Sequence, residues 1–78
     1  MQKEMDHIMK MIEDGKGRVS AADVVRSIEI DPELRRTNYA VAKQSLRAAG
    51  KLYAHNARAE DGKRIHELVA GRNPSKTG

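Results

Sequence analysis

The stretch TNYAVAKQSLRAAGKLYAH, residues 37–55, decides the fold. Its apolar residues recur at spacings of three and four, which places them on one face of a helix: Tyr39, Ala42, Leu46 and Ala49. Thr37 and Asn38 are helix-capping types, because their short side chains can accept hydrogen bonds from the free N–H groups of a first turn. Gly50 can adopt the left-handed conformation that ends a helix. The stretch therefore predicts a helix over about 37–49 and, directly after its glycine, a strand.

The opposite face of this helix is basic and also carries an amide. It holds Ala40, Lys43, Gln44, Arg47 and Lys51. The pattern L-x-x-x-G-x-L, formed by Leu46, Gly50 and Leu52, resembles the end of the recognition helix in winged helix-turn-helix domains. The resemblance covers about residues 4–69. It implies a mainly α fold with a small antiparallel β hairpin, namely a winged helix of three helices plus a C-terminal wing over residues 1–70, and it implies DNA binding.

Length and composition limit the kind of protein. A chain of 78 residues makes one domain with a small core. It has no cysteine, which excludes disulfides and thiolate zinc sites, and its three histidines lack a metal-ligand spacing. The apolar runs are too short for a transmembrane helix or a signal peptide. We therefore expect an intracellular domain with no membrane partner, metal, cofactor or small-molecule substrate.

The distribution of charge separates two parts of the chain. The net charge is +4. Residues 1–34 hold five basic and eight acidic side chains, for −3, whereas residues 35–64 hold eight basic and two acidic ones, for +6. The basic block coincides with the expected recognition helix and wing. This coincidence favours a nucleic-acid face over a merely solvated one.

An amphipathic helix is expected at the start of the chain. Residues 1–14 have an apolar face made of Met5, Ile8, Met9 and Ile12. The charged residues, Glu4 among them, lie elsewhere on this helix. Gly15 and Gly17 are expected to end it.

A second helix is expected after a short strand at residues 18–19. Ser20, with Asp23 three residues later, is close to a capping box. The buried face of this helix is Val24, Val25 and Ile28. Pro32 stops the helix near Ile30, because proline cannot donate a hydrogen bond and restricts the residue before it.

Residues 31–37, DPELRRT, form the turn before the third helix. The segment is longer than the three or four residues that are common in helix-turn-helix motifs. Asp31 as N-cap and Pro32 at the first helical position could begin an extra helical turn. Such a turn could also run into the third helix, so the positions of Arg35 and Arg36 depend on this segment.

The segment after the third helix has two interpretations. Asp61-Gly62 is a turn dipeptide between two strand patterns, which predicts a hairpin. A fourth helix capped by Gly71 is the alternative, because three apolar residues also fit helical spacing: Ile65, Leu68 and Val69. We favour the hairpin, as a wing over about residues 52–69. Residues 71–78 are polar and contain glycine and proline, so a flexible tail or linker is expected there.

The winged-helix resemblance assigns DNA contacts to residues of this chain. Asn38 and Gln44 can each pair bidentately with adenine, and Arg47 can reach guanine or a phosphate. Arg35 and Arg36 suit phosphate contacts beside the helix N-terminus. The full expected DNA-binding set is Arg35, Arg36, Thr37, Asn38, Gln44, Arg47, Lys51, Arg58, Lys63 and Arg64.

The leading hypothesis is therefore a double-stranded DNA-binding module. It could be a small transcription regulator or part of a replication, recombination or partition protein, and self-association or a larger parent protein stays open. An enzyme is not expected, because the chain has no nucleophile–base set and no phosphate-binding glycine loop. The alternative is a winged-helix protein-interaction module, which has no need of the basic block. Readers of left-handed DNA or double-stranded RNA form a third class. Ala40 and Gln44 stand where left-handed DNA readers place asparagine and tyrosine, which argues against the first of these.

Overall fold

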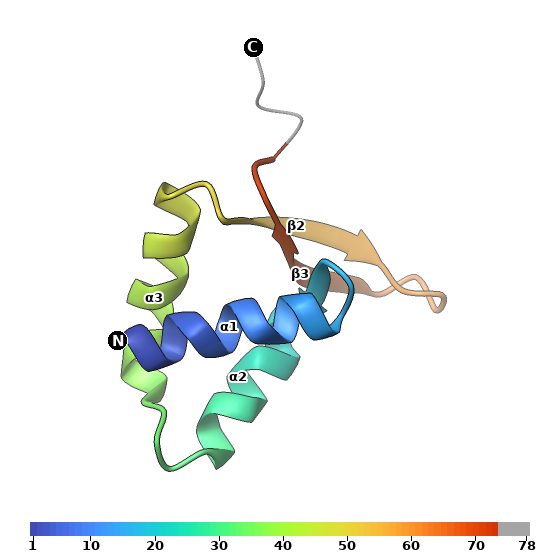
Figure 1. The fold of residues 1–78 in the computed structure, drawn as a ribbon. Helices are drawn as coiled ribbons and strands as arrows, with labels where there is room; N and C mark the ends of the chain where they lie inside the picture. Colours follow the sequence, from blue (N-terminus) through green and yellow to red (C-terminus); the bar gives the residue numbers. More distant parts are fainter. Residues whose placement is uncertain (74–78) are drawn as a thin grey trace.

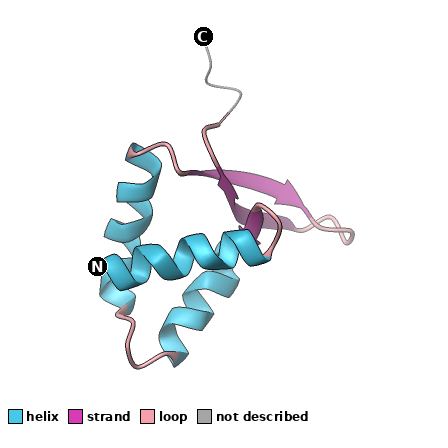
Figure 2. Ribbon diagram, in the orientation of Figure 1, coloured by secondary structure: helices cyan, strands magenta, loops and turns pink. Residues whose placement is uncertain are grey.

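Three helices pack against one face of a three-stranded antiparallel sheet (Figure 1, Figure 2). The computed structural model describes residues 1–73. In chain order the elements are α1 (Gln2–Asp14), β1 (Arg18–Ser20), α2 (Ala21–Ile30), α3 (Arg36–Ala48), β2 (Leu52–Arg58) and β3 (Arg64–Ala70). The three helices, the short strand and the hairpin expected from the sequence are all present. Most of the tail expected at 71–78 lies outside the described residues.

The central strand of the sheet is β3, which pairs with β1 on one side and β2 on the other. The return of the chain as β3 excludes the fourth helix that the sequence left open. The turn residues explain the hairpin. Gly62 has φ +83 and donates its N–H to the Ala59 carbonyl at 2.9 Å, while the Asp61 carboxylate accepts from the Lys63 N–H at 3.1 Å. A three- to five-residue hairpin loop favours glycine at such a left-handed position.

The core lies between the helices and the inner face of the sheet. Its buried apolar residues are Ile8, Ile12, Ala21, Val24, Ile28, Tyr39, Ala42, Leu46, Leu52 and Leu68. Tyr39, Ala42 and Leu46, the last only 5% exposed, confirm three residues of the predicted buried face of α3. The fourth, Ala49, is exposed, because the helix ends at Ala48 and Ala49 is its C-cap. The chain has no phenylalanine or tryptophan, and flexible methionines pack around this core instead. Within residues 1–73, no helix has the length and apolar content that a membrane crossing requires.

The C-terminal end of α3 follows the sequence prediction. Gly50 has φ +72. Its N–H donates to the Arg47 carbonyl at 3.0 Å, and the Lys51 N–H donates to the Leu46 carbonyl at 2.9 Å. These two bonds form a Schellman motif, which satisfies carbonyls at the helix end and requires a left-handed residue there. Gly50 therefore fixes the direction in which the chain leaves α3 for β2.

The N-terminal end of α3 differs from the prediction. The helix begins at Arg36, and its N-cap is Arg35, whose side chain makes no capping hydrogen bond. Thr37 and Asn38 lie inside the first helical turn, so the capping role predicted for them is wrong. The physical reason is a carboxylate from α1, described below, which reaches this end of the helix and takes over the capping function.

Two other predictions from short sequence patterns, a helix start at Asp31 and a capping box at Ser20, are not matched by the structure. The segment before α3 is a turn, neither an extra helix nor a continuation of α3, because the Asp31 carboxylate accepts from the Glu33 N–H at 2.9 Å. At the start of α2, Ser20 is the N-cap but makes no side-chain capping bond. The capping box suggested by the sequence is not formed, since Asp23 pairs instead with Arg26 at 3.5 Å.

Candidate nucleic-acid interface

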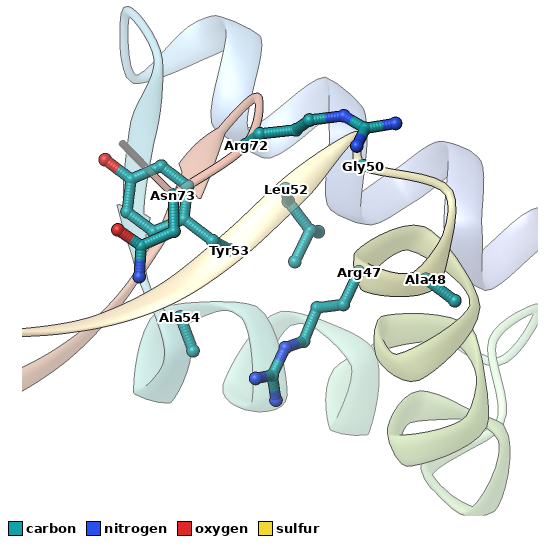
Figure 3. Close-up of a pocket in the computed structure, with 8 residues that line it drawn as sticks. All are labelled: Arg47, Ala48, Gly50, Leu52, Tyr53, Ala54, Arg72 and Asn73. Carbon is teal, nitrogen blue, oxygen red and sulfur yellow. The ribbon is translucent and has the colours of Figure 1, made fainter. Parts of the chain in front are cut away.

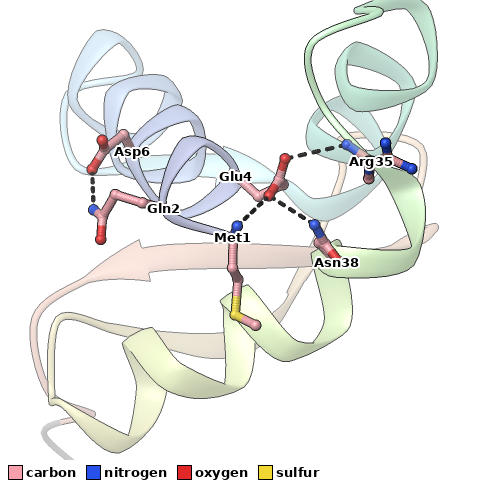
Figure 4. A network of polar contacts seen from close by, with 6 residues as sticks. All are labelled: Met1, Gln2, Glu4, Asp6, Arg35 and Asn38. Atoms are coloured by element: carbon pink, nitrogen blue, oxygen red, sulfur yellow. Dashed lines mark hydrogen bonds and ion pairs between the residues drawn. The ribbon is translucent and has the colours of Figure 1, made fainter.

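A buried carboxylate from α1 faces the N-terminal end of α3 (Figure 4). Glu4 is 2% exposed, although the sequence placed it off the buried face of its helix. Its Oε2 accepts from the Arg35 backbone N–H at 3.2 Å, and its Oε1 accepts from Asn38 Nδ2 at 3.1 Å. The Met1 ammonium lies 3.3 Å from Oε1. Because a helix N-terminus carries partial positive charge, the carboxylate stabilises this end of α3.

The Glu4 carboxylate changes the DNA contacts that can be expected from residues at the N-terminal end of α3. Helix N-termini commonly bind phosphates, but here Glu4 would repel one. Asn38 donates its amide to Glu4, so a bidentate contact to adenine would have to replace that bond. Burial alone would raise the pKa of the Glu4 carboxyl, but hydrogen bonds from Asn38 and Arg35 and the nearby terminal ammonium outweigh it. Together they hold this pKa below its ordinary value.

Arg36 also contacts the protein itself. Its Nε lies 3.4 Å from Glu29 Oε1, and its guanidinium carbon lies 5.8 Å from the centroid of the Tyr39 ring. Lys43 Nζ lies 5.5 Å from the same centroid. Cations within about 6 Å of an aromatic centroid are attracted to the ring, so Tyr39 holds both side chains on one flank of α3.

Tyr39 itself belongs to the core. Its hydroxyl is buried and has no hydrogen-bond partner in the described part of the chain. Burial raises the pKa of this phenol, and the Arg36 guanidinium acts in the opposite direction. The ring is therefore a core residue that contacts two cations, and it is not exposed for stacking on a nucleotide base.

The outward face of α3 is exposed along its whole length. It carries Thr37, Ala40, Val41, Gln44, Arg47 and Ala48. Gln44 and Arg47 make no side-chain hydrogen bond or ion pair with any residue in the range 1–73. Lys51, just beyond the helix, is exposed in the same way. This part of α3 can enter a groove without giving up an internal contact.

The β2–β3 hairpin presents three more cations. Arg58 and Arg64 face each other in the register, with Lys63 in the loop between them, and all three are exposed. Like charges directly opposite in an antiparallel pair are destabilising, so an anion near Arg58 and Arg64 would relieve a repulsion. Glu60 and Asp61 in the same loop offset part of the charge. The tip projects away from the three helices (Figure 1), which leaves it accessible.

The ten expected DNA-contacting residues therefore fall into two groups. The first, at the N-terminal end of α3, is Arg35, Arg36, Thr37 and Asn38. The second follows the C-terminal half of α3 and the hairpin, and is Gln44, Arg47, Lys51, Arg58, Lys63 and Arg64. The strand β2 connects α3 to the hairpin tip, so one continuous stretch of chain carries the second group.

The structure adds a residue that the sequence did not indicate. An open hollow of about 570 Å³ lies between the C-terminal end of α3 and the start of β2 (Figure 3). Its lining includes Arg47, Gly50, Leu52, Tyr53, Ala54 and Arg72. Arg72 packs against Gly50, where an added Cβ would lie 2.6 Å from Arg72 Nε. The polar composition of residues 71–78 predicted a tail that includes Arg72. The one feature of the sequence that could have pointed to Arg72 is that a basic residue follows the second hairpin strand closely.

Histidine and serine contacts in the described residues link elements of the fold. His66 lies opposite Asn56, and its Nδ1 is 3.3 Å from Asn56 Oδ1. His7 Nε2 lies 2.8 Å from Ser27 Oγ and ties α1 to α2. No cluster of three histidine, cysteine, aspartate or glutamate side chains suited to a metal ion occurs in residues 1–73.

Comparison with known proteins assigns no family to the chain. No family model, curated protein or solved structure was found to match it. A function for this domain therefore rests on the contacts and charges described above.

Proposed function

We propose that this chain is a winged helix-turn-helix module that binds double-stranded DNA. The element order supports this fold, because a hairpin follows the third helix directly and β1 joins it in one sheet. One observation carries the function, namely where the uncompensated cations lie. Arg18 and Arg26 each pair with a carboxylate. Arg47, Lys51 and the hairpin cations have no acidic partner within residues 1–73 and lie on one continuous stretch of chain. The lysines of residues 1–34 also lack an ion pair, but they lie in the part of the chain whose net charge is −3.

Groove geometry suggests how the two parts of the surface would act. The major groove of B-DNA admits a helix or a two-stranded ribbon, and its base edges are distinguishable there. We assign it to α3, because the hairpin carries its cations only at its tip. Gln44 and Arg47 project from the exposed face of α3 and suit base edges. The hairpin cations suit phosphates, which position a protein without selecting a sequence. Lys51, exposed just beyond the C-terminal end of α3, suits a phosphate on that side of the groove, whereas Glu4 disfavours a phosphate beside Arg35 at the other end.

A salt-dependent titration against random duplex DNA tests the proposal. Binding to several phosphates releases counterions, so affinity should fall steeply between about 50 and 200 mM salt. Replacing Arg58 and Arg64 together by alanine should reduce the salt slope by about two, one for each lost phosphate contact. Arg26→Ala, on α2, is the matched control and should leave the slope unchanged. Absent binding at low salt, or a flat salt response, would reject DNA as the partner.

A protein-interaction module is the second candidate, and one observation favours it. The outward face of α3 is apolar at its centre, where Val41 is 49% exposed and is flanked by Ala40 and Ala48. Interfaces are depleted of charge at their centre and polar at their rim. The same titration separates the two candidates, because a module of this kind would show no steep salt-dependent affinity for random duplex.

A further inference from the structure

The outer edge of β2 is free over its whole length. One edge of β2 pairs with β3, and no other strand in residues 1–73 pairs with the opposite edge. The bonds at the two ends of the ladder show which backbone groups face outward: Gly71 donates to the Lys51 carbonyl and Ala59 donates to the Lys63 carbonyl, both at 2.9 Å. Hydrogen-bonded pairs alternate along an antiparallel ladder. Residues 51, 53, 55, 57 and 59 therefore face β3, whereas Leu52, Ala54, Asn56 and Arg58 direct their N–H and C=O groups outward.

This edge has few of the features that prevent strand addition. Proteins protect edge strands with charged side chains, especially lysine, with proline or bulges, by very short length, or with a covering helix or loop. Here β2 has seven residues, LYAHNAR, with no proline or lysine, and its one charged residue, Arg58, lies at the end far from the hollow. Its register with β3 is one-to-one from Leu52 to Arg58, so no bulge interrupts it. The edge is thus competent to pair with another extended segment.

The hollow described above lies along the first part of this edge. Leu52 and Ala54, whose backbone groups face outward, line it together with Arg47 and Arg72. In Figure 3 the Arg72 guanidinium lies against Gly50, and the Arg47 guanidinium lies on the other side of Leu52. Neither arginine has an ion-pair partner in the part of the chain that the structure describes. An occupant would meet a strand edge flanked by two cations.

We propose that this hollow binds an extended acidic peptide, which adds a strand to the free edge of β2 and places carboxylates against Arg47 and Arg72. Strand addition supplies main-chain hydrogen bonds, and side-chain contacts supply specificity. A nucleic-acid strand fits less well, because the outward edge of Leu52 and Ala54 presents both N–H and C=O groups. A peptide can pair with both kinds of group, whereas phosphates can accept only from the N–H groups. A second copy of β2 also fits less well, since it has no carboxylate and would bring Arg58 toward these cations.

This inference goes beyond DNA binding and does not require it. Arg47 belongs both to the hollow and to the proposed DNA surface, so an acidic peptide bound here would compete with duplex DNA. A partner protein with an acidic extended segment could in that way release the domain from DNA.

The direct test is a titration of the 78-residue chain into a fluorescent peptide of alternating valine and glutamate, at low salt. We expect saturable binding, and little binding when lysine replaces each glutamate. N-methylation of alternate peptide residues removes the N–H groups on one edge of the peptide strand. One methylation pattern should abolish binding and the other should preserve it, because only one edge faces β2.

Two variants locate the site. Arg72→Ala should weaken peptide binding by about tenfold, which corresponds to about 1.4 kcal/mol. Ala54→Pro removes an outward N–H, a change that edge strands tolerate, and should weaken binding with the melting temperature preserved. Arg26→Ala, on α2, is the control and should change nothing.

Several results would overturn the proposal. These are no peptide binding, equal binding of the lysine peptide, or full binding by Arg72→Ala. An Arg72→Ala effect on duplex DNA alone would make the hollow a phosphate contact instead. If DNA binding failed while the acidic peptide bound, the present inference would stand and the proposed function would not.

Discussion

Near the N-terminal end of α3 two polar side chains pair with acidic residues of the fold, whereas those nearer its C-terminal end make no hydrogen bond or ion pair within residues 1–73. Asn38 donates to Glu4, and Arg36 pairs with Glu29 and lies over Tyr39. Gln44 and Arg47, two turns further along the same helix, have no such partner. The amino-acid types at the two ends are similar, so the difference comes from what packs beside them.

The cause of this difference is the position of α1 and α2. The first turn of α1 brings the Glu4 carboxylate beside the start of α3, and α2 brings Glu29 beside Arg36. Beyond Gly50 no acidic side chain pairs with the exposed cations of the described hairpin. A basic residue in this domain is therefore a good candidate for ligand binding only where α1 and α2 supply no carboxylate. This rule ranks Arg47, Arg58 and Arg64 above Arg36.

Leu46→Ala should cause the largest loss of stability, because the Leu46 side chain packs the whole of α3 against the core. Leu46 is 5% exposed in the core, and truncating such a side chain costs roughly 2–5 kcal/mol. A domain of this size has little stability to lose. Urea unfolding should show a strongly lowered midpoint or no folded baseline.

The matched control is Gln44→Ala on the outward face of the same helix. Surface substitutions of this kind usually change stability by no more than about 0.5 kcal/mol. Equal stability of the two variants would show that the buried and outward faces of α3 have been assigned wrongly.

Much of the fold could be predicted from local patterns. The spacing of Tyr39, Ala42 and Leu46 gave the buried face of α3, and Gly50 gave its end, because both depend on residues close in sequence. The hairpin needed only a turn dipeptide and flanking strands. Each of these features follows from the period of a helix or a strand, or from the conformational freedom of glycine.

The polar contacts could not be predicted in the same way. Glu4 lies among charged residues on α1, and nothing in its own segment indicates that Arg35 and Asn38 will bury it. Likewise, Arg72 lies against Gly50, a residue that lies before the hairpin in the sequence, where an added Cβ would come within 2.6 Å of the Arg72 Nε. Such contacts join residues that are far apart in sequence, so periodicity and capping rules contain no information about them.

Substitutions in the second group should separate sequence selection from general affinity. Arg47→Ala and Gln44→Ala should change the preferred DNA sequence, by about 1–3 kcal/mol for a bidentate contact. Arg58→Ala and Arg64→Ala should weaken binding to all sequences alike. Binding-site selection with each purified variant measures both effects. This expectation assumes that α3, and not the hairpin, enters the major groove, where the base pairs can be distinguished.

Arg36→Ala is the control that tests the comparison between the two ends of α3. Because Arg36 already contacts Glu29 and Tyr39, its loss should affect DNA binding less than the loss of Arg47. A larger effect for Arg36→Ala would contradict the ranking of the two ends of α3. A changed sequence preference in the hairpin variants would show that the hairpin, and not α3, contacts the bases.

Glu4→Gln should have a smaller effect, and one that depends on pH. The pKa of Glu4 in the folded protein lies below its ordinary value of 4.5. A carboxyl with a lowered folded pKa contributes stability that is fully present above its unfolded pKa and is lost as pH falls through the folded value. The wild-type chain should therefore be more stable than Glu4→Gln at neutral pH, and the gap should narrow below about pH 4.5.

Urea unfolding at neutral and acidic pH measures this gap. Glu13→Gln, an exposed position on the same helix, is the control and should show little difference from wild type at any pH. A gap for Glu4→Gln that did not change with pH would mean that the charge of Glu4 does not hold the N-terminal end of α3. DNA binding by Glu4→Gln at neutral pH should remain, since its partners are not in the second group.

Tyr39→Phe is the one change in this series that should cause no loss of stability. The hydroxyl of Tyr39 is buried with no partner among the described residues, and a buried polar group without a hydrogen bond destabilises a fold by about 1–3 kcal/mol. Phenylalanine removes that group but keeps the ring, which fills the core and attracts Arg36 and Lys43. The melting temperature should therefore be equal to that of wild type or higher.

Tyr53→Phe, at a half-buried position on β2, is the control for loss of a hydroxyl that water can reach. A clear loss of stability in Tyr39→Phe alone would show that the hydroxyl has a partner, such as a buried water. In that case the first turns of α3 are held by a hydrogen bond in the core as well as by the buried Glu4 carboxylate of α1.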